Sequence, residues 1–443
     1  MALHQELGIF AILDELEVQR TRAGVPDELL LRTLATLPFV EQASLSGASE
    51  VLFREPAVLL QLGWAPVQIR QGSNGRHREG RQEESLPCHP DTLRDALRRV
   101  GESAWLRAQT AGVQSLYQRQ LVRGKVYAID GSGLGDDFRL VALVCVSATR
   151  PIIVAWRLLS GPSSEKGQEA AVTRALIEQV LQVAGPQAIS LRLPDALYAD
   201  GPLLAWLKYG KGIDALVSLP QERLLYQDLK GLADGQLLDW THHRYVRTVQ
   251  GHKQVREVEV TAAGALTSWD GFTEAAARYG VPDASLWACL IHDVTTAELA
   301  AEPPRALVST RSFADGFAAL QAYRPRWHIE DDTYRELKEG WGREQQRWGR
   351  DFAAALGRTT LTCLAFNTAQ VYRLQAGERL AGMAIRRLRR QRQRELGSAP
   401  AVLYIAGCYG VFSLEELLVV LGSAPRGSLL PTLAKPPAPD SPT

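Results

Sequence analysis

Residues 125–161, KVYAIDGSGLGDDFRLVALVCVSATRPIIVAWRLLSG, contain three short apolar runs that are separated by turns. The runs KVYAID, RLVALVCVSA and IIVAWRLLSG are rich in β-branched and aromatic residues, so each of them predicts a β-strand. The connections between the runs are short enough for hairpins. This stretch therefore predicts the first three strands of a sheet.

The sequence after this stretch alternates between helix and strand. An amphipathic helix is predicted from about residue 164 to 185, and the strand AISLRLPD, which ends at Asp195, follows it. A helix, GPLLAWLKYG, and a fifth strand, DALVSLP, come next. The helix between the third and fourth strands permits a crossover that lays the fourth strand parallel to and beside the first. This element order predicts an α/β fold with an RNase H-like sheet.

The flanking regions differ in the period of their apolar residues. Helices are predicted in the N-terminal region at LDELEVQRTR, PDELLLRTLATL, AVLLQLG and PDTLRDALRRVGESAWL. The segments LLYQDL, LLDWTHHRYVRTVQ, KQVREVEVTAA and SLWACLIHDV predict an antiparallel β-rich insertion, and a helical pattern returns at SFADGFAALQAY. Near the end, VLYIAG predicts a strand, LEELLVVLG a helix, and the proline-rich tail is expected to be disordered.

These patterns predict six segments. They are a mainly helical N-terminal region that is a candidate for DNA binding (1–118), an RNase H-like core in two parts (119–209 and 311–380), a β-rich insertion between those parts (210–310), a basic C-terminal segment (381–423) and the tail (424–443).

Composition places the chain among ordinary globular proteins. Its 443 residues are 46% hydrophobic and 22% charged, which excludes wholesale disorder. The N-terminal stretch has no basic start, and no window approaches the roughly 18 uninterrupted apolar residues of a membrane helix. A soluble, cytoplasmic protein is therefore expected. Its cysteines are scattered, form no CxxC pair and argue against a zinc site: Cys88, Cys145, Cys289, Cys363 and Cys408.

The net charge of +1 is low for a protein that binds nucleic acid, but the basic residues are unevenly placed. Residues 385–394, IRRLRRQRQR, hold six arginines and no acid, and residues 70–81, RQGSNGRHREGR, hold four arginines and one acid. Each run is either a solvated surface or a patch for phosphates, and the sequence favours neither reading.

Two aspartates are candidate ligands for a metal ion. Asp130 is expected at the end of the first strand, before the small-residue loop GSGLG, and Asp195 at the end of the fourth. Asp130 could instead cap a turn. Asp200 competes with Asp195, but its place before Gly201-Pro202 and an apolar helix predicts a structural role as an N-cap.

The third candidate acid lies in YRPRWHIEDDTYRELKEGWG, residues 323–342. On an α-helix of about 100° per residue, Glu330 shares a face with Tyr323 and Arg326, whereas Asp332 turns to solvent. Lys338 lies at the edge of the Glu330 face. Two aspartates and a glutamate form an oxygen-only ligand set that suits Mg²⁺ or Mn²⁺, and two such ions support phosphodiester cleavage.

These motifs resemble those of the DDE transposases of bacterial insertion sequences, in particular the cut-and-paste group with a Tyr-Arg-Glu-Lys signature, insertion-sequence family four. The signature spaces Tyr, Arg, Glu and Lys by two, three and six residues. Tyr323, Arg326 and Glu330 match it, while Lys338 comes one residue late. IDGSGL, PDALYADGPLLAWL, WHIE, YRELK, EGWG and LTCLAFN also resemble this family, over about residues 120–370.

The resemblance implies a homodimeric enzyme that cuts double-stranded DNA at transposon ends, passes through a hairpin and joins the ends to target DNA. It implies that Asp130, Asp195 and Glu330 bind two Mg²⁺ or Mn²⁺ ions and that Tyr323, Arg326 and Lys338 hold phosphates. The family stacks a flipped base on a tryptophan of its insertion. The candidates for this role are Trp240, Trp269 and Trp287, each of which could instead pack in the core. Two alternatives stay open: a catalytically inactive, transposase-derived DNA-binding protein, and an RNase H-like nuclease without strand transfer.

Overall fold

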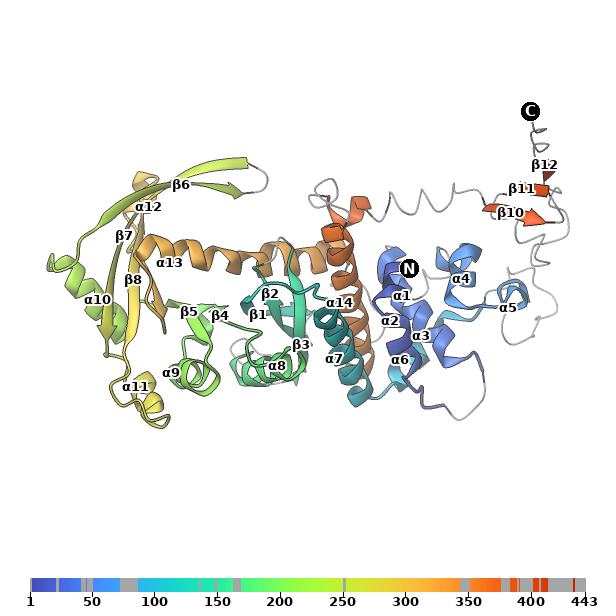
Figure 1. Cartoon of the computed structure of the whole chain (residues 1–443), viewed down its shortest axis with the longest axis horizontal. Coiled ribbons are helices and arrows are strands. Elements are labelled where there is room, and N and C mark those ends of the chain that lie inside the picture. The colour runs from blue at the N-terminus through green and yellow to red at the C-terminus, as the bar shows by residue number, and fades with distance from the viewer. Residues whose placement is uncertain are drawn as a thin grey trace, which may run out of the picture. The chain divides into compact units, whose positions relative to one another are not determined.

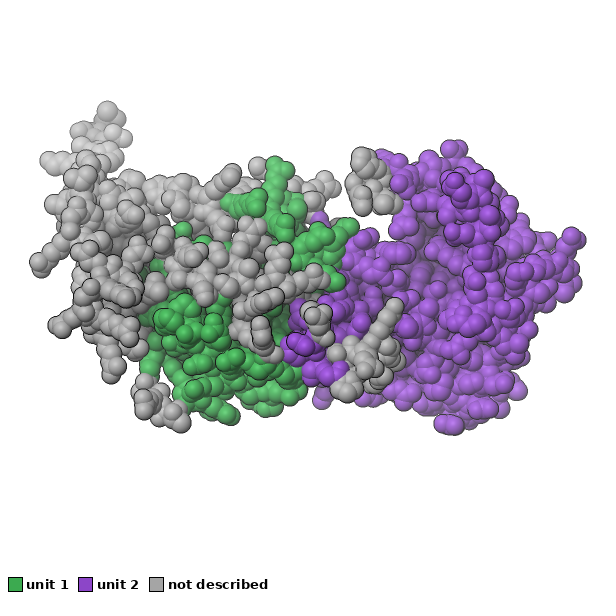
Figure 2. Space-filling model, turned by 180° about the vertical axis from the view of Figure 1, so that it is seen from behind, with its two compact units in different colours: residues 1–115, 335–443 green, residues 116–334 purple. Residues whose placement is uncertain are grey.

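The computed structural model describes the following residues: 2–20, 24–40, 45, 51–71, 87–134, 137–147, 150–161, 169–249, 252–342, 351–375, 383–388, 390, 401–405, 408–412 and 433–434. The chain forms two compact units, residues 116–334 and residues 1–115 with 335–443 (Figure 2). Within the described residues, no helix is both long enough and apolar enough to cross a membrane.

The unit of residues 116–334 is built on one mixed nine-stranded sheet with the order β3-β2-β1-β4-β5-β9-β8-β7-β6 (Figure 1). The strands are β1 (Val126–Leu134), β2 (Phe138–Cys145), β3 (Ile152–Ser160), β4 (Leu191–Pro194), β5 (Asp214–Leu219), β6 (Thr241–Val249), β7 (His252–Leu266), β8 (Leu286–Asp293) and β9 (Arg305–Ser309). The prediction of an α/β fold is confirmed at this level.

The predicted crossover is present. β1, β2 and β3 pair antiparallel, and α8 (Glu169–Ala184) returns the chain so that β4 lies parallel to β1. The interior residues of these strands are apolar and buried, which explains why local pattern alone predicted them. The parallel pairing ends at Ile129 and Pro194. Asp130 and Asp195 are therefore the next residue on each of two neighbouring strands.

The strands of the predicted insertion continue the same sheet, because β9 pairs antiparallel with β5. One expected strand is wrong: LLYQDL belongs to α10 (Leu224–Asp234). Leu225, Tyr226, Leu229 and Ala233 are buried at intervals of about one helical turn, so a helix buries them on one face and a strand would not. The other helices here are α9 (Gly201–Ala205), followed by a π-helical segment (Trp206–Gly210), α11 (Asp270–Ala277) and α12 (Ala297–Ala300).

The helical run that carries the third acid begins well before Pro325. α13 (Gly316–Tyr323) is capped by Asp315, whose Oδ1 accepts a hydrogen bond from the Ala318 N–H at 2.7 Å. The 3₁₀ turn η7 (Arg324–Arg326) holds Pro325, and the π-helical segment η8 (Ile329–Tyr334) follows shortly after. Tyr323 and Glu330 therefore lie on one run of helical turns.

The second unit is mainly helical in its described part. Its helices are α1 (Ala2–Glu6), α2 (Ile9–Asp14), α3 (Asp27–Thr36), α4 (Pro56–Leu62), α5 (Pro66–Gln71), α6 (Pro90–Arg99), α7 (Glu102–Gln118, the last three residues of which belong to the other unit) and α14 (Phe352–Gln375). The helix expected at LDELEVQRTR is wrong, since α2 ends at Asp14. Leu16 and Val18 are buried two residues apart, the spacing of an extended chain.

The C-terminal predictions fall mostly outside the described residues. The strand expected at VLYIAG is present as β10 (Ala401–Ile405), which pairs with β11 (Cys408–Phe412). The helix expected at LEELLVVLG lies outside the described residues, as does the tail except for β12 (Leu433–Ala434), which pairs with β11. Of the arginine run, Arg386, Arg387 and Arg390 are described and exposed.

Candidate active site

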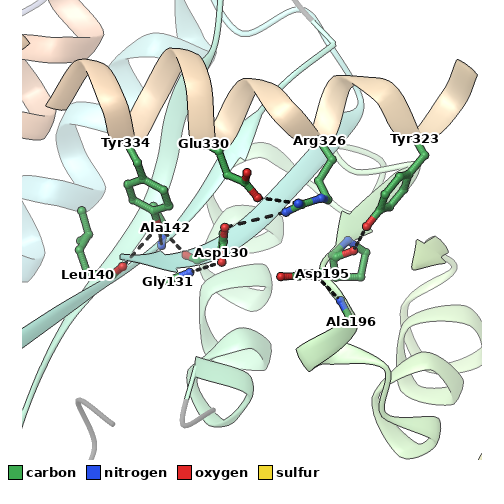
Figure 3. Close-up of polar contacts among 11 residues, drawn as sticks. Asp130, Gly131, Leu140, Ala142, Asp195, Ala196, Tyr323, Arg326, Glu330 and Tyr334 are labelled. Carbon is green, nitrogen blue, oxygen red and sulfur yellow. Dashed lines mark hydrogen bonds and ion pairs between the residues drawn. The ribbon is translucent and has the colours of Figure 1, made fainter. Parts of the chain in front are cut away.

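Asp130 lies inside β1 and not at its end, because GSGL continues the strand and pairs with β2. It is nevertheless the first residue beyond the parallel pairing with β4. Its side chain is 16% exposed, and its Oδ1 accepts a hydrogen bond from the Gly131 N–H at 2.7 Å. The other carboxylate oxygen, Oδ2, points towards Arg326 (Figure 3).

Asp195 follows β4 and caps the 3₁₀ turn η5 (Ala196–Tyr198) through a hydrogen bond from the Ala196 N–H to Oδ1. The sequence did not predict this capping role. Asp200 caps α9 as expected, since its Oδ2 accepts from the Leu203 N–H at 2.9 Å. Asp195 uses one oxygen for its turn, and its other oxygen points to the side on which Asp130 lies (Figure 3).

Glu330 comes from the helical run that lies above Asp130 and Asp195 in Figure 3. Its Oε1 pairs with Nη2 of Arg326 at 2.5 Å, and Nη1 of the same guanidinium lies 3.9 Å from Oδ2 of Asp130. Asp332 instead pairs with His328. The side chains of Glu330 and Asp332 are equally exposed, at 36%, so the two acids differ in their partners and the expected turn of Asp332 alone to solvent is not observed.

The pKa of Asp130 is shifted by its surroundings. Burial, and to a smaller extent the negative charges of Glu330 and Asp195, raise this pKa to about 6. The Gly131 N–H and the Arg326 guanidinium lower it, but they do not cancel the effect of burial. Among the described residues, no group of three acidic, histidine or cysteine side chains is arranged to hold a metal ion. At the candidate site, the Arg326 guanidinium lies between Glu330 and Asp130.

Arg326 is almost fully buried and incompletely hydrogen-bonded. It is 6% exposed, and its Nε and Nη1 have no hydrogen-bond partner in the described part of the chain. Its guanidinium carbon lies 5.9 Å from the ring centroid of Tyr323 and 5.2 Å from that of Trp327. Buried donors of a charged group without partners are costly, so these two atoms indicate a place for an anionic ligand.

Tyr323 joins the helix to the strand of the second acid. Its hydroxyl donates to the Pro194 carbonyl at 2.9 Å, directly before Asp195. The sequence predicted this residue for the site as a phosphate ligand. In the structure the hydroxyl is buried and already bonded, and burial raises its pKa. Tyr323 therefore fixes the distance between the helix and β4.

Tyr334 makes a second link that the sequence reading missed. Its hydroxyl donates to the main-chain carbonyl of Asp130, lies 3.3 Å from the Leu140 carbonyl and accepts from the Ala142 N–H at 3.2 Å. These groups belong to β1 and β2. Tyr323 and Tyr334 thus hold the Glu330 helix to the sheet on both sides of the acid (Figure 3).

Replacing Tyr334 by phenylalanine is expected to lower the free energy of unfolding by about 1–3 kcal/mol, because buried main-chain groups lose their partner. Urea denaturation of the wild type and the Tyr334→Phe variant measures this difference. Tyr279→Phe is the matched control, since Tyr279 is 44% exposed and its loss of a hydroxyl leaves the unfolding free energy within about 0.5 kcal/mol. Equal effects of the two substitutions would show that the Tyr334 hydroxyl stabilises the folded protein no more than an exposed hydroxyl does.

The remaining predicted residues lie elsewhere. Lys338 belongs to the other compact unit, in the π-helical segment Glu336–Gly340, and its role stays a prediction. Trp287 is 7% exposed and packs against Phe313 in the core. Trp240 is 38% exposed. Trp269 lines a pocket of about 360 Å³ together with Arg223, whose guanidinium lies 5.7 Å from its ring.

Five of the six predicted site residues thus meet in one unit, around a buried arginine, and only Lys338 lies outside it. No protein-family model and no curated protein sequence matches the chain.

Proposed function

We propose that the protein is a metal-dependent DNA transposase that cuts transposon ends and joins them to target DNA, and that its sheet is an RNase H-like core. One observation carries the proposal. Carboxylates from β1, from the end of β4 and from a helical segment far along the chain lie near one another where the pairing of β1 with β4 ends. The strand order β3-β2-β1-β4-β5 with a crossover helix after β3 supports the same core.

The donor set fits divalent cations. It offers only carboxylate oxygens, the ligands that Mg²⁺ and Mn²⁺ prefer. The charges of Asp195 and Glu330 add to the cost of ionising the buried Asp130, as the raised pKa of Asp130 shows, and a cation placed among them would offset that cost. The three acids would hold two ions, which when bound supply an activated oxygen nucleophile and stabilise the leaving oxygen.

The residues of the chain have separate tasks in this proposal. Arg326 holds the phosphate, because its free Nε and Nη1 donate to phosphate oxygens in the fork geometry that suits them. Glu330, which pairs with Arg326 in this structure, would be the third ligand of the ions. Tyr323 and Tyr334 keep the helix at a fixed distance from Asp195 and Asp130. The near-neutral chain holds DNA through local basic patches, and paired ends imply a homodimer.

A joining assay tests this function and separates it from the two alternatives. The protein is incubated with Mg²⁺, a supercoiled plasmid and labelled duplexes taken from the DNA that flanks the gene. A transposase gives 3′-OH nicks, hairpin ends and labelled plasmid. Nicks without labelled plasmid would favour a nuclease, and a gel shift without any cleavage would favour an inactive DNA-binding protein.

DNA binding is expected to weaken steeply with salt, because phosphate contacts release counterions. The apparent Kd, measured by fluorescence anisotropy between 50 and 200 mM KCl, should rise at least about 1,000-fold if six or more phosphates are contacted. A Kd that does not change with salt contradicts the local basic patches.

A further inference from the structure

The β6–β7 hairpin has two chemically different faces. On one face, Arg244 and His242 lie across from acids of β7, with Nε of Arg244 3.6 Å and Nε2 of His242 3.7 Å from the carboxylate of Glu257. Successive side chains of a strand alternate between faces, so His243, Tyr245 and Arg247 lie on the other face. We call these three residues the hairpin contact face.

The hairpin contact face packs against the helix of the candidate active site. The His243 ring stacks on Phe317 with centroids 4.3 Å apart, and the Arg324 guanidinium lies 5.2 Å from the centroid of Tyr245. Arg247 lies over Trp327 at 5.2 Å. All three contacts reach α13 or the turn that follows it, so the hairpin is seated beside the site by aromatic and cationic groups.

Trp327 connects this face to the arginine of the site. Its ring takes two guanidiniums, Arg247 from the hairpin and Arg326 from the neighbouring position on the helix, each at 5.2 Å. Arg326 has one hydrogen bond in the described part of the chain, to Glu330. The direction of its free donors therefore depends on the rings of Tyr323 and Trp327.

The two rings are secured in different ways. Tyr323 is buried and bonded to Pro194, whereas Trp327 is 36% exposed. Arg247 covers part of the Trp327 ring, which without this contact would be free to adopt other rotamers. A cation over a tryptophan face is the strongest pairing of this type.

We propose that Arg247 is a positioning residue, which acts through Trp327 to hold the Arg326 guanidinium in its phosphate-binding orientation. This inference rests on the proposed function. Under this proposal the hairpin is part of the catalytic apparatus and not only a surface for DNA. Loss of the Arg247 contact therefore lowers the cleavage rate even at saturating DNA.

Single-turnover cleavage at saturating DNA, together with the Kd for DNA, tests the proposal. Arg247→Ala is expected to lower the rate about tenfold with little change in Kd, in line with the strength of a cation–π contact. Arg247→Lys, which keeps a cation, should recover part of the rate. In a Trp327→Leu background the further effect of Arg247→Ala should vanish, as expected for two residues that act through one contact.

Arg244→Ala is the matched control, since Arg244 is three residues away on the opposite face and carries the same charge. It is expected to cleave at the wild-type rate. A weakened Kd for Arg247→Ala with a wild-type rate at saturation would overturn the proposal, because Arg247 would then be an ordinary phosphate contact. Equal rate losses for both alanine variants would also overturn it.

A second measurement does not depend on catalysis. The arginine Nε–H signal of Arg326, assigned by its loss in Arg326→Lys, is followed by ¹⁵N NMR, because a nearby indole ring shifts it. Arg247→Ala should move this signal, and Arg244→Ala should not. An unmoved signal in Arg247→Ala overturns the positioning role even if the protein cleaves DNA. If the Arg326 signal moves in Arg247→Ala but the wild type cleaves no DNA, the contact through Trp327 is supported and the proposed function is rejected.

Discussion

Replacing Asp130, Asp195 or Glu330 by alanine is expected to lower the rate of Mg²⁺-dependent DNA cleavage about 1,000-fold or more, while the Kd for DNA changes little. Each substitution removes one oxygen donor from a cation site that contributes several kcal/mol to the transition state, and about 4 kcal/mol corresponds to this factor. The three residues come from β1, from the turn after β4 and from η8, so a common loss requires that they act at one place.

The neighbouring acids provide the control. Asp331→Ala and Asp332→Ala change the same charge within two residues of Glu330, and Asp332 pairs with His328 and not with Arg326. Both variants should cleave within about threefold of the wild type. Undiminished cleavage by Glu330→Ala would contradict the assignment of the third acid. Loss of cleavage in Asp331→Ala alone would move that assignment to Asp331, because six residues separate it from Lys338, as in the signature.

The first four strands and the place of β4 beside β1 could be predicted because they depend on local pattern. β1, β2 and β3 are continuous apolar runs, and a single helix between β3 and β4 leaves few ways to place β4. Short-range information therefore placed Asp130 and Asp195 on neighbouring strands.

The contacts among the site residues depend on distant parts of the chain. Tyr334 bonds to main-chain groups of β1 and β2 about 200 residues earlier, a distance in sequence that no helical or strand period reports. Arg247 meets Trp327 only because β6 is the last strand of the sheet and its hairpin returns over α13.

At pH 7, and in EDTA to exclude metal ions, Asp130→Asn is expected to raise the free energy of unfolding by about 2–3 kcal/mol, although it abolishes cleavage. The pKa of Asp130 is about 6 in the folded protein and 3.8 in the unfolded chain. The folded state therefore binds more protons between these values, and wild-type stability falls as the pH rises through them. Each unit of this pKa difference corresponds to about 1.4 kcal/mol, which gives the expected gain in the free energy of unfolding.

The sign of the effect makes the prediction specific. Below about pH 4, Asp130 is protonated in both states, so wild type and Asp130→Asn should unfold at nearly equal urea concentrations; the difference should open between pH 4 and 6 and then stay constant. Asp234→Asn is the control, since Asp234 is 64% exposed and its variant should differ from wild type by less than about 0.5 kcal/mol at every pH. A constant Asp130→Asn difference across this range would contradict the electrostatic origin.

Adding Mg²⁺ should reverse the order of stability. A ligand that binds only the folded state at 100 times its Kd stabilises that state by about 2.7 kcal/mol. Wild type should gain this stabilisation, because the cation offsets the cost of keeping the buried Asp130 charged beside Asp195 and Glu330. Asp130→Asn lacks one charged ligand and should gain little. If Mg²⁺ stabilised both proteins equally, the ion would bind away from Asp130, and the cost of burying this aspartate would need a reason other than metal binding.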